Sequence, residues 1–154
     1  MNINKTRYDI FVNIVGAGIL IAMVLYLWLN WQEIPESIPA HYNAAGVIDR
    51  WGNKKEIFIE VIIAWILYIG ITVLERFPQI WNTGVTVTEQ NKVRVYRILK
   101  NLIETQKLLI AAIFSYSALN SALSRSMSVW FLPIVLVLMF GSIAFFTVQL
   151  IKVK

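Results

Sequence analysis

Four long apolar stretches constrain the fold more than any other feature of this sequence. They lie at about residues 10–29, 57–74, 103–123 and 130–151. Crossing the roughly 30 Å hydrocarbon core of a bilayer takes about 20 helical residues at a rise of about 1.5 Å each. Each stretch approaches or meets that length and holds few charges. The sequence therefore predicts an all-α integral membrane protein with four transmembrane helices, forming a single membrane domain over residues 1–154.

Composition favours lipid exposure over a large soluble core. The chain is 58% hydrophobic and 15% charged, whereas a soluble domain carries about 25% charged residues. It has no cysteine, which excludes disulfides and thiolate metal sites. Its net charge of +5 is compatible with nucleic-acid binding, but basic residues beside apolar spans more often set topology and meet lipid head groups. We therefore expect the lipid bilayer as a partner and no nucleic acid.

The distribution of basic residues predicts the orientation. With the N-terminus inside, the inner segments hold ten Lys and Arg residues and the outer segments hold four, as the positive-inside rule requires. The first apolar stretch is longer than the core of a signal peptide and lacks a following cleavage site, so we expect it to stay as a membrane anchor. This predicts cytoplasmic N and C termini, a structured extracytoplasmic loop at residues 30–56 and a cytoplasmic segment at 75–106.

The outer loop contains residues that favour extended and turned backbone. Proline fixes its own φ angle and restricts the residue before it, and glycine permits positive φ. We expect these residues to give the loop its structure: Pro35, Pro39, Gly46 and Gly52.

Three polar residues of this loop, with one carboxylate in the second span, form the candidate ligand-binding site: His41, Asn43, Asp49 and Glu60. The loop residues could instead bond only to the loop's own backbone in a structural lid. Glu60 lies about one turn inside its span, where a carboxylate is costly and indicates function. The alternative is that Glu60 lies in the interface or pairs with Lys54 or Arg50.

A cation at the outer loop is a further hypothesis, because carboxylate, amide and carbonyl oxygens suit a hard cation. Asp49, Asn43 and Glu36 would supply the side-chain oxygens. One histidine and no cysteine disfavour a structural zinc site. No cofactor is predicted, and the identity of any metal is left open.

Features near the third and first spans predict local contacts. Thr86 and Glu89 have the spacing of a capping box, so a helix should begin just after Thr86 and extend the third span into the cytoplasm. Glu104 and Lys107 then fall in the entry turn of that span. Asn13, Asn30 and Asn120 can each bridge helices by a hydrogen bond, and Gly16-Ala17-Gly18 should allow close helix approach in the first span.

The outer loop also carries a resemblance. The string Ile38-Pro39-Ala40-His41-Tyr42-Asn43, followed by Gly46 and Asp49, resembles the bacterial membrane family called domain of unknown function 1648, which also forms part of SdpI-type immunity proteins. The resemblance covers about residues 10–96. It implies a multi-pass protein of the bacterial cell membrane. SdpI-type proteins are associated with protection against a secreted peptide toxin and with signalling.

Three functions remain open on the sequence. The first is an immunity or sensing protein whose outer loop binds a peptide or envelope ligand. Such a protein could have a peptide or protein partner and could form an oligomer. The second is a membrane enzyme in which His41 acts as acid or base, oriented by Glu60 or Asp49; the lack of a clear nucleophile and of a second histidine counts against it. The third is a small transporter or an accessory subunit, which few ionisable residues within the spans support.

Overall fold

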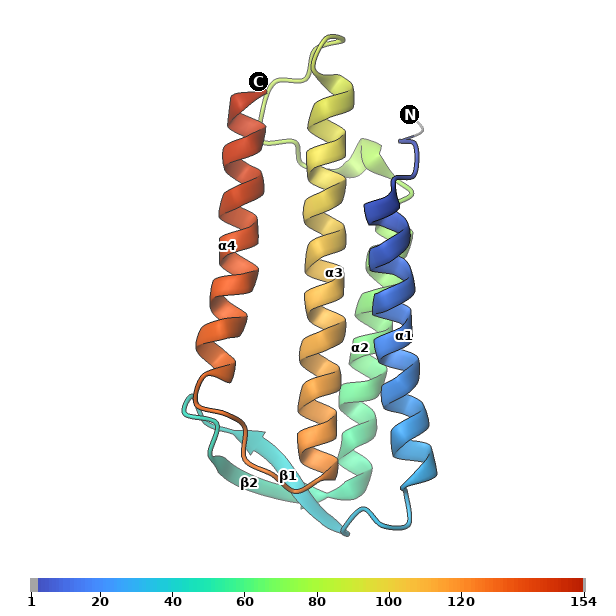
Figure 1. Cartoon of the computed structure of the whole chain (residues 1–154), viewed down its shortest axis with the longest axis vertical. Coiled ribbons are helices and arrows are strands. Elements are labelled where there is room, and N and C mark those ends of the chain that lie inside the picture. The colour runs from blue at the N-terminus through green and yellow to red at the C-terminus, as the bar shows by residue number, and fades with distance from the viewer. Residues whose placement is uncertain (1–2, 154) are drawn as a thin grey trace.

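Four long helices lie side by side in the computed structural model, which describes residues 3–153 (Figure 1). Met1, Asn2 and Lys154 lie outside the described residues, and Lys154 is one of the ten inner basic residues behind the predicted orientation. The helices are α1 (Arg7–Leu29), α2 (Ile57–Leu74), α3 (Lys92–Ala122) and α4 (Phe131–Lys152). Each is long and apolar enough to cross a membrane. The prediction of four helices that are long and apolar enough to cross a membrane is therefore confirmed.

The two described ends of the chain lie at one end of the bundle, and a β-hairpin lies at the other (Figure 1). We call these the termini end and the hairpin end. An even number of crossings brings both ends of a chain to one side. The positive-inside pattern assigns the termini end to the cytoplasm, and that orientation stays a prediction.

The hairpin consists of β1 (Ser37–Tyr42) and β2 (Ile48–Asn53), which pair antiparallel with Ser37 opposite Asn53. The pairing is irregular between Pro39 and Tyr42, as expected where proline cannot donate to the ladder. The turn is closed by Asn43, whose side-chain oxygen accepts hydrogen bonds from the backbone N–H groups of Ala45 and Val47. The outer loop thus adds a two-stranded sheet, so the prediction of an all-α protein is incomplete. A short 3-10 helix, η1 (Lys54–Glu56), leads into α2.

The tip of the hairpin packs on the connection between α3 and α4. The backbone N–H of Met127 donates to the carbonyl of Gly46 at 2.9 Å. Gly46 has φ of +78°, and a Cβ atom there would lie 2.5 Å from the carbonyl oxygen of Met127. Only glycine suits both the positive φ and this close backbone approach.

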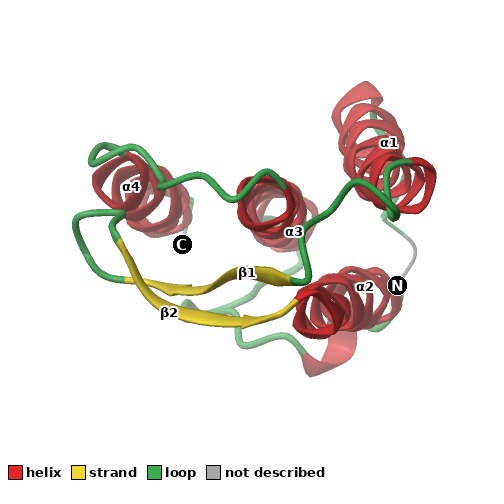
Figure 2. Cartoon of the chain, turned by 90° about the horizontal axis from the view of Figure 1, so that it is seen from below, coloured by secondary structure: helices red, strands yellow, loops and turns green. Residues whose placement is uncertain are grey.

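Helix α3 is the centre of the bundle, with α4 on one side and α1 and α2 on the other (Figure 2). Helices α1 and α2 each pack chiefly on α3 and touch one another little. One such contact is Gly16 against the ring of Tyr68, where a Cβ atom would lie 2.8 Å from Cε2. The predicted close approach is confirmed at Gly16, whereas the Cβ position of Gly18 faces open space.

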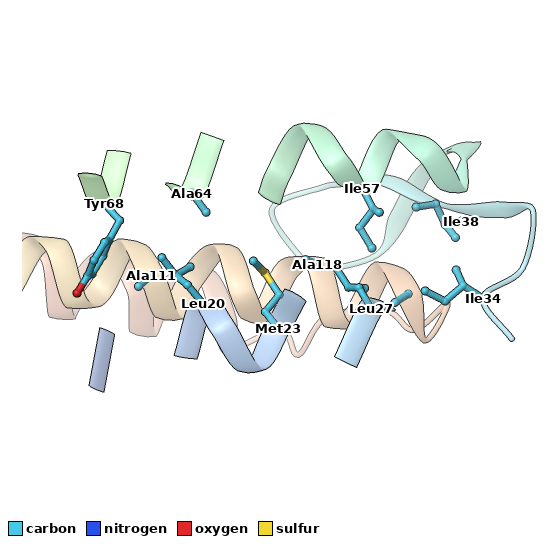
Figure 3. Close-up of a cluster of buried hydrophobic side chains, with 11 residues drawn as sticks. Leu20, Met23, Leu27, Ile34, Ile38, Ile57, Ala64, Tyr68, Ala111 and Ala118 are labelled. Carbon is cyan, nitrogen blue, oxygen red and sulfur yellow. The ribbon is translucent and has the colours of Figure 1, made fainter. Parts of the chain in front are cut away.

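The main hydrophobic core joins α1, α2, α3 and the hairpin, and Figure 3 shows side chains from all four meeting along α3. Its buried residues are Leu20, Met23, Leu27, Ile34, Ile38, Ile57, Ala64, Tyr68, Ala111, Ala118 and Ala122. A second cluster at the termini end joins Val95, Ile98 and Leu99 of α3 to Leu150 of α4. The alanines on α3 let the larger side chains of its neighbours approach closely.

Helix α3 begins at Lys92, not just after Thr86, so the predicted start is wrong by about five residues. Reciprocal bonds between side chain and backbone join Thr88 and Asn91 instead, in the turn just before the helix. The backbone N–H of Asn91 donates to the Thr88 hydroxyl at 3.3 Å, and the N–H of Thr88 donates to the Asn91 side chain at 2.7 Å. Asn91 also bonds the carbonyl of Thr86, which holds Thr86 outside the helix. A short 3-10 helix, η2 (Pro78–Ile80), lies in the preceding connection.

Candidate functional site

A cavity of about 510 Å³ lies at the hairpin end, between the hairpin, α2, α3 and the start of α4. Three of the four candidate ligand-binding residues line it: His41, Asn43 and Glu60. Tyr42 and Ser117 line it as well. The structure therefore brings the loop residues and the carboxylate of the second helix to one cavity, although they come from separate elements.

The fourth candidate, Asp49, does not line the cavity but bonds to His41, which does. Its Oδ1 lies 2.6 Å from Nδ1 of His41, across the two strands of the hairpin. The side chains of His41 and Asp49 are 64% and 41% exposed. With Nδ1 engaged by the carboxylate, Nε2 is the ring nitrogen that His41 can offer to a ligand or substrate.

Glu60 lies in the first turn of α2, and its Oε2 is buried without a hydrogen-bond partner. The alternative that Glu60 pairs with Lys54 or Arg50 is wrong, because both bases have other partners. Nζ of Lys54 lies 2.8 Å from Glu36, and the Arg50 guanidinium lies 3.0 Å from Glu56. A buried carboxylate oxygen without a donor is costly, so Glu60 favours a ligand that brings one.

Tyr42 adds a neutral hydroxyl to the same cavity. Its hydroxyl oxygen lies 3.3 Å from the hydroxyl of Ser121 on α3. Burial raises the pKa of Tyr42 above its ordinary value. The phenol therefore stays protonated at neutral pH and can donate or accept a hydrogen bond.

The oxygens considered for a cation at the loop do not converge. Asn43 bonds the hairpin turn, Asp49 bonds His41, and Glu36 pairs with Lys54. Within residues 3–153, no group of three or more His, Asp or Glu side chains is arranged to hold a metal ion. A cation at the outer loop stays a prediction.

A second polar region lies at the termini end and was not predicted as a site. Six charged side chains gather there from α1, the end of α2 and α3: Asp9, Glu75, Arg97, Lys100, Glu104 and Lys107. We call them the charged cluster. Asp9, 2% exposed, lies 3.0 Å from the Arg97 guanidinium and 2.7 Å from Nζ of Lys100.

Lys107 is the deepest basic residue of this cluster and is fully buried. Its Nζ lies 2.6 Å from the Glu75 carboxylate, donates to the side-chain oxygen of Asn13 at 2.9 Å and reaches the Thr72 hydroxyl at 3.4 Å. The predicted bridging role is therefore confirmed for Asn13, whereas Asn30 and Asn120 each donate to a backbone carbonyl four residues earlier in their own segment. Tyr68 donates to the backbone carbonyl of Asn13 at 2.9 Å, which joins α1 to α2.

The sequence held a signal for the charged cluster. Lys100, Glu104 and Lys107 are spaced by four and three residues, so they share one face of a helix. The same face continues with the small residues Ala111, Ser115 and Ala118, a pattern typical of a helix face that packs on other helices. All three are buried in the structure. The prediction placed Glu104 and Lys107 at a membrane boundary, where charges are common, and so missed their burial.

Comparison with known proteins supports the resemblance in the hairpin region. Residues 18–65 match the family described as domain of unknown function (DUF1648), as predicted from the loop. The matched segment runs from α1 through the hairpin into α2 and contains all four candidate residues. The relation to SdpI-type proteins stays a prediction.

One curated relative is an uncharacterized protein of Archaeoglobus fulgidus. It is 31% identical over 81 residues, which cover 47% of this chain and 44% of that protein. The chain thus spans less than half the length of this relative. No solved structure matches the chain.

Proposed function

We propose that this membrane protein binds a peptide or another cell-envelope ligand at the hairpin end, in an immunity or sensing role, and that Glu60 receives a primary amine of the ligand. One observation carries the proposal. Two predicted residues of the hairpin, His41 and Asn43, and one of α2, Glu60, line a single cavity, and the buried Oε2 of Glu60 has no hydrogen-bond partner.

The chemistry of the cavity favours an amine over an anionic group. An ammonium group brings three N–H donors, and a carboxylate accepts charge-assisted hydrogen bonds that are stronger than neutral ones. The Tyr42 hydroxyl and the exposed ring of His41 provide further polar contacts around it. The volume of about 510 Å³ lies within the range of about 300–1,000 Å³ that small ligands occupy.

The hairpin also suits recognition from outside the cell, given the orientation that the basic residues predict. Binding residues are frequent on loops held by a rigid scaffold. Here the tip of the hairpin is fixed on the α3–α4 connection through Gly46. His41 and Asp49 remain exposed on the strands, where an approaching ligand would meet them first.

Binding can be tested with the tripeptide Gly-Gly-Lys and its fully acetylated form. Thermal unfolding of the purified protein in detergent micelles should shift upward with the free amine and not with the acetylated peptide. Glu60→Gln should abolish the shift, because the amide keeps the volume and loses the charge. Glu33→Gln, an exposed residue at the same end, is the matched control. Equal shifts with both peptides would contradict the role of the amine.

The immunity role has a separate, cellular test. Expressing the chain in a host sensitive to a secreted peptide toxin should raise survival. Variants His41→Ala and Asp49→Asn should lose the protection while reaching the membrane in normal amounts. Survival that is unchanged by expression would leave ligand binding in place and remove the immunity role.

A second candidate function follows from the His41–Asp49 pair. The distance of 2.6 Å and the free Nε2 are the arrangement by which a carboxylate orients a histidine base. A hydrolase acting on a lipid-linked or peptide substrate would use this pair to activate water. A turnover assay separates the two functions. An enzyme should release product from a lipid-linked or peptide substrate and lose this turnover in the Asp49→Asn variant, whereas a binding protein should release no product.

A further inference from the structure

A second cavity, of about 710 Å³, lies at the termini end between α1, α2 and α3. Because α1 and α2 pack chiefly on α3 and little on each other, the cavity reaches between them. Ile10 and Ile14 of α1 line it and are 51% and 68% exposed. One wall of this cavity is therefore apolar and continuous with the lipid-facing surface of the bundle.

The inner wall of the cavity carries a carboxylate without a hydrogen bond, Glu104. Glu104 is fully buried, and neither of its carboxylate oxygens has a hydrogen bond. The nearest base, Nζ of Lys100, is 3.8 Å away and lies 2.7 Å from Asp9. Asp9 and Glu75, which also line the cavity, each have a basic partner within 3.0 Å. Glu104 is thus the acid of the charged cluster that lines the cavity and has the longest ion pair, with neither oxygen hydrogen-bonded.

The edge of the cavity has the opposite charge. Lys5 and Arg76 line it and are exposed. Neither makes an ion pair with any residue from 3 to 153. From its inner wall to its edge, the cavity therefore has a carboxylate without a hydrogen bond and then two bases without an ion pair. Ile10 and Ile14 form an apolar wall beside them.

We propose that this cavity binds a phospholipid with a primary ammonium head group, such as phosphatidylethanolamine. The ammonium donates to Glu104, the phosphate lies between Lys5 and Arg76, and an acyl chain follows Ile10 and Ile14. A phosphate alone would leave the Glu104 oxygens without a hydrogen-bond donor. A choline head group carries the same charge but is bulkier and brings no N–H donor to the carboxylate.

The lipid preference can be measured without any variant. Delipidated protein in detergent would be titrated by native mass spectrometry with four lipids of identical acyl chains: phosphatidylethanolamine, its N-methyl and N,N-dimethyl forms, and phosphatidylcholine. Affinity should fall along this series as N–H donors are lost, by about tenfold or more overall, the effect expected for losing charge-assisted hydrogen bonds. Equal affinities across the series would overturn the proposal.

Variants then test the two halves of the site. Glu104→Gln should remove the preference for phosphatidylethanolamine over phosphatidylcholine. Glu89→Gln should keep it, because Glu89 is an exposed acid just before α3. Replacing Lys5 and Arg76 together by Gln should weaken binding of both lipids alike. Retention of the preference in Glu104→Gln protein that elutes as a folded species would refute the role of Glu104.

Soluble phosphoethanolamine distinguishes a lipid from a free solute. It carries the same ammonium and phosphate groups but no acyl chain. We expect it to compete at least tenfold more weakly than the lipid, because it gains nothing from the apolar wall. Equally strong competition would show that the site takes a soluble amine phosphate and would overturn the assignment to a lipid.

Discussion

Replacing Lys107 by methionine tests whether the charged cluster holds the helices together. The side chain is fully buried, and its Nζ lies 2.6 Å from Glu75. Methionine keeps much of the length and loses the charge. The substitution leaves the Glu75 carboxylate, whose side chain is only 9% exposed, without its partner.

The expected loss can be worked from these contacts. Removing one partner of a buried ion pair costs about 3–5 kcal/mol, because the remaining charge stays buried. The bonds of Lys107 to Asn13 and Thr72 are lost too, and interhelical hydrogen bonds in membranes average about 0.6 kcal/mol each. We therefore expect Lys107→Met to lower the free energy of unfolding by about 3–5 kcal/mol.

A double-mutant cycle separates the ion pair from the packing of the lysine side chain. Glu75→Gln removes the buried charge that Lys107→Met leaves behind. The double variant should be more stable than the sum of the two single losses predicts, by about 1–3 kcal/mol. Additive losses would mean that the two side chains do not interact.

Unfolding can be followed in mixed micelles by titration with sodium dodecyl sulfate and tryptophan fluorescence. The ring of Trp65 lies 6.2 Å from that of Tyr68, and Nζ of Lys107 lies 5.3 Å from the same Tyr68 ring, so Trp65 reports on this region. Lys92→Met on the same helix is the control, since its pair with Glu89 is exposed and should contribute little. A loss for Lys107→Met no greater than that for Lys92→Met would refute the reasoning.

Three further predictions concern the hairpin, a helix contact and the orientation. Gly46→Ala should lower the free energy of unfolding by more than about 1 kcal/mol, because alanine is strained at positive φ and its Cβ would clash with the backbone of Met127. It should also increase proteolysis of the hairpin. Gly16→Ala should lower the thermal midpoint because its Cβ meets the Tyr68 ring, whereas Gly18→Ala should leave it unchanged or raise it. Because the chain has no cysteine, single variants Glu33→Cys and Gln90→Cys give the orientation: an impermeant maleimide added to whole cells should label the first and not the second.

The helices were predictable where charges mark the ends of an apolar stretch. Helix α2 was predicted at 57–74 and is Ile57–Leu74, because charged residues precede and follow it. Helix α1 begins three residues before its predicted start. Its first turn is polar and is stabilised by the reciprocal bonds of Thr6 and Asp9, which a hydropathy pattern does not register.

The candidate site was predictable in its residues and not in its geometry. Turn-forming and polar residues marked the outer loop, but the pairing of β1 with β2 depends on contacts with the rest of the bundle. Asp49 and His41 are eight positions apart, and only the hairpin brings them to 2.6 Å. The burial of Glu104 and Lys107 was missed for a related reason: hydropathy averages over a helix and hides the direction in which each side chain points.

The contact between Gly46 and Met127 has a consequence for how the chain is made. The two residues lie 81 positions apart, and Met127 comes just before the fourth helix. During synthesis, the hairpin tip emerges long before the connection on which it rests. The hairpin tip can therefore dock only after the third helix has been made and its far end has reached the hairpin end of the bundle. A chain stalled before that point would have an undocked strand pair, so docking of the tip also marks a chain whose third helix is in place.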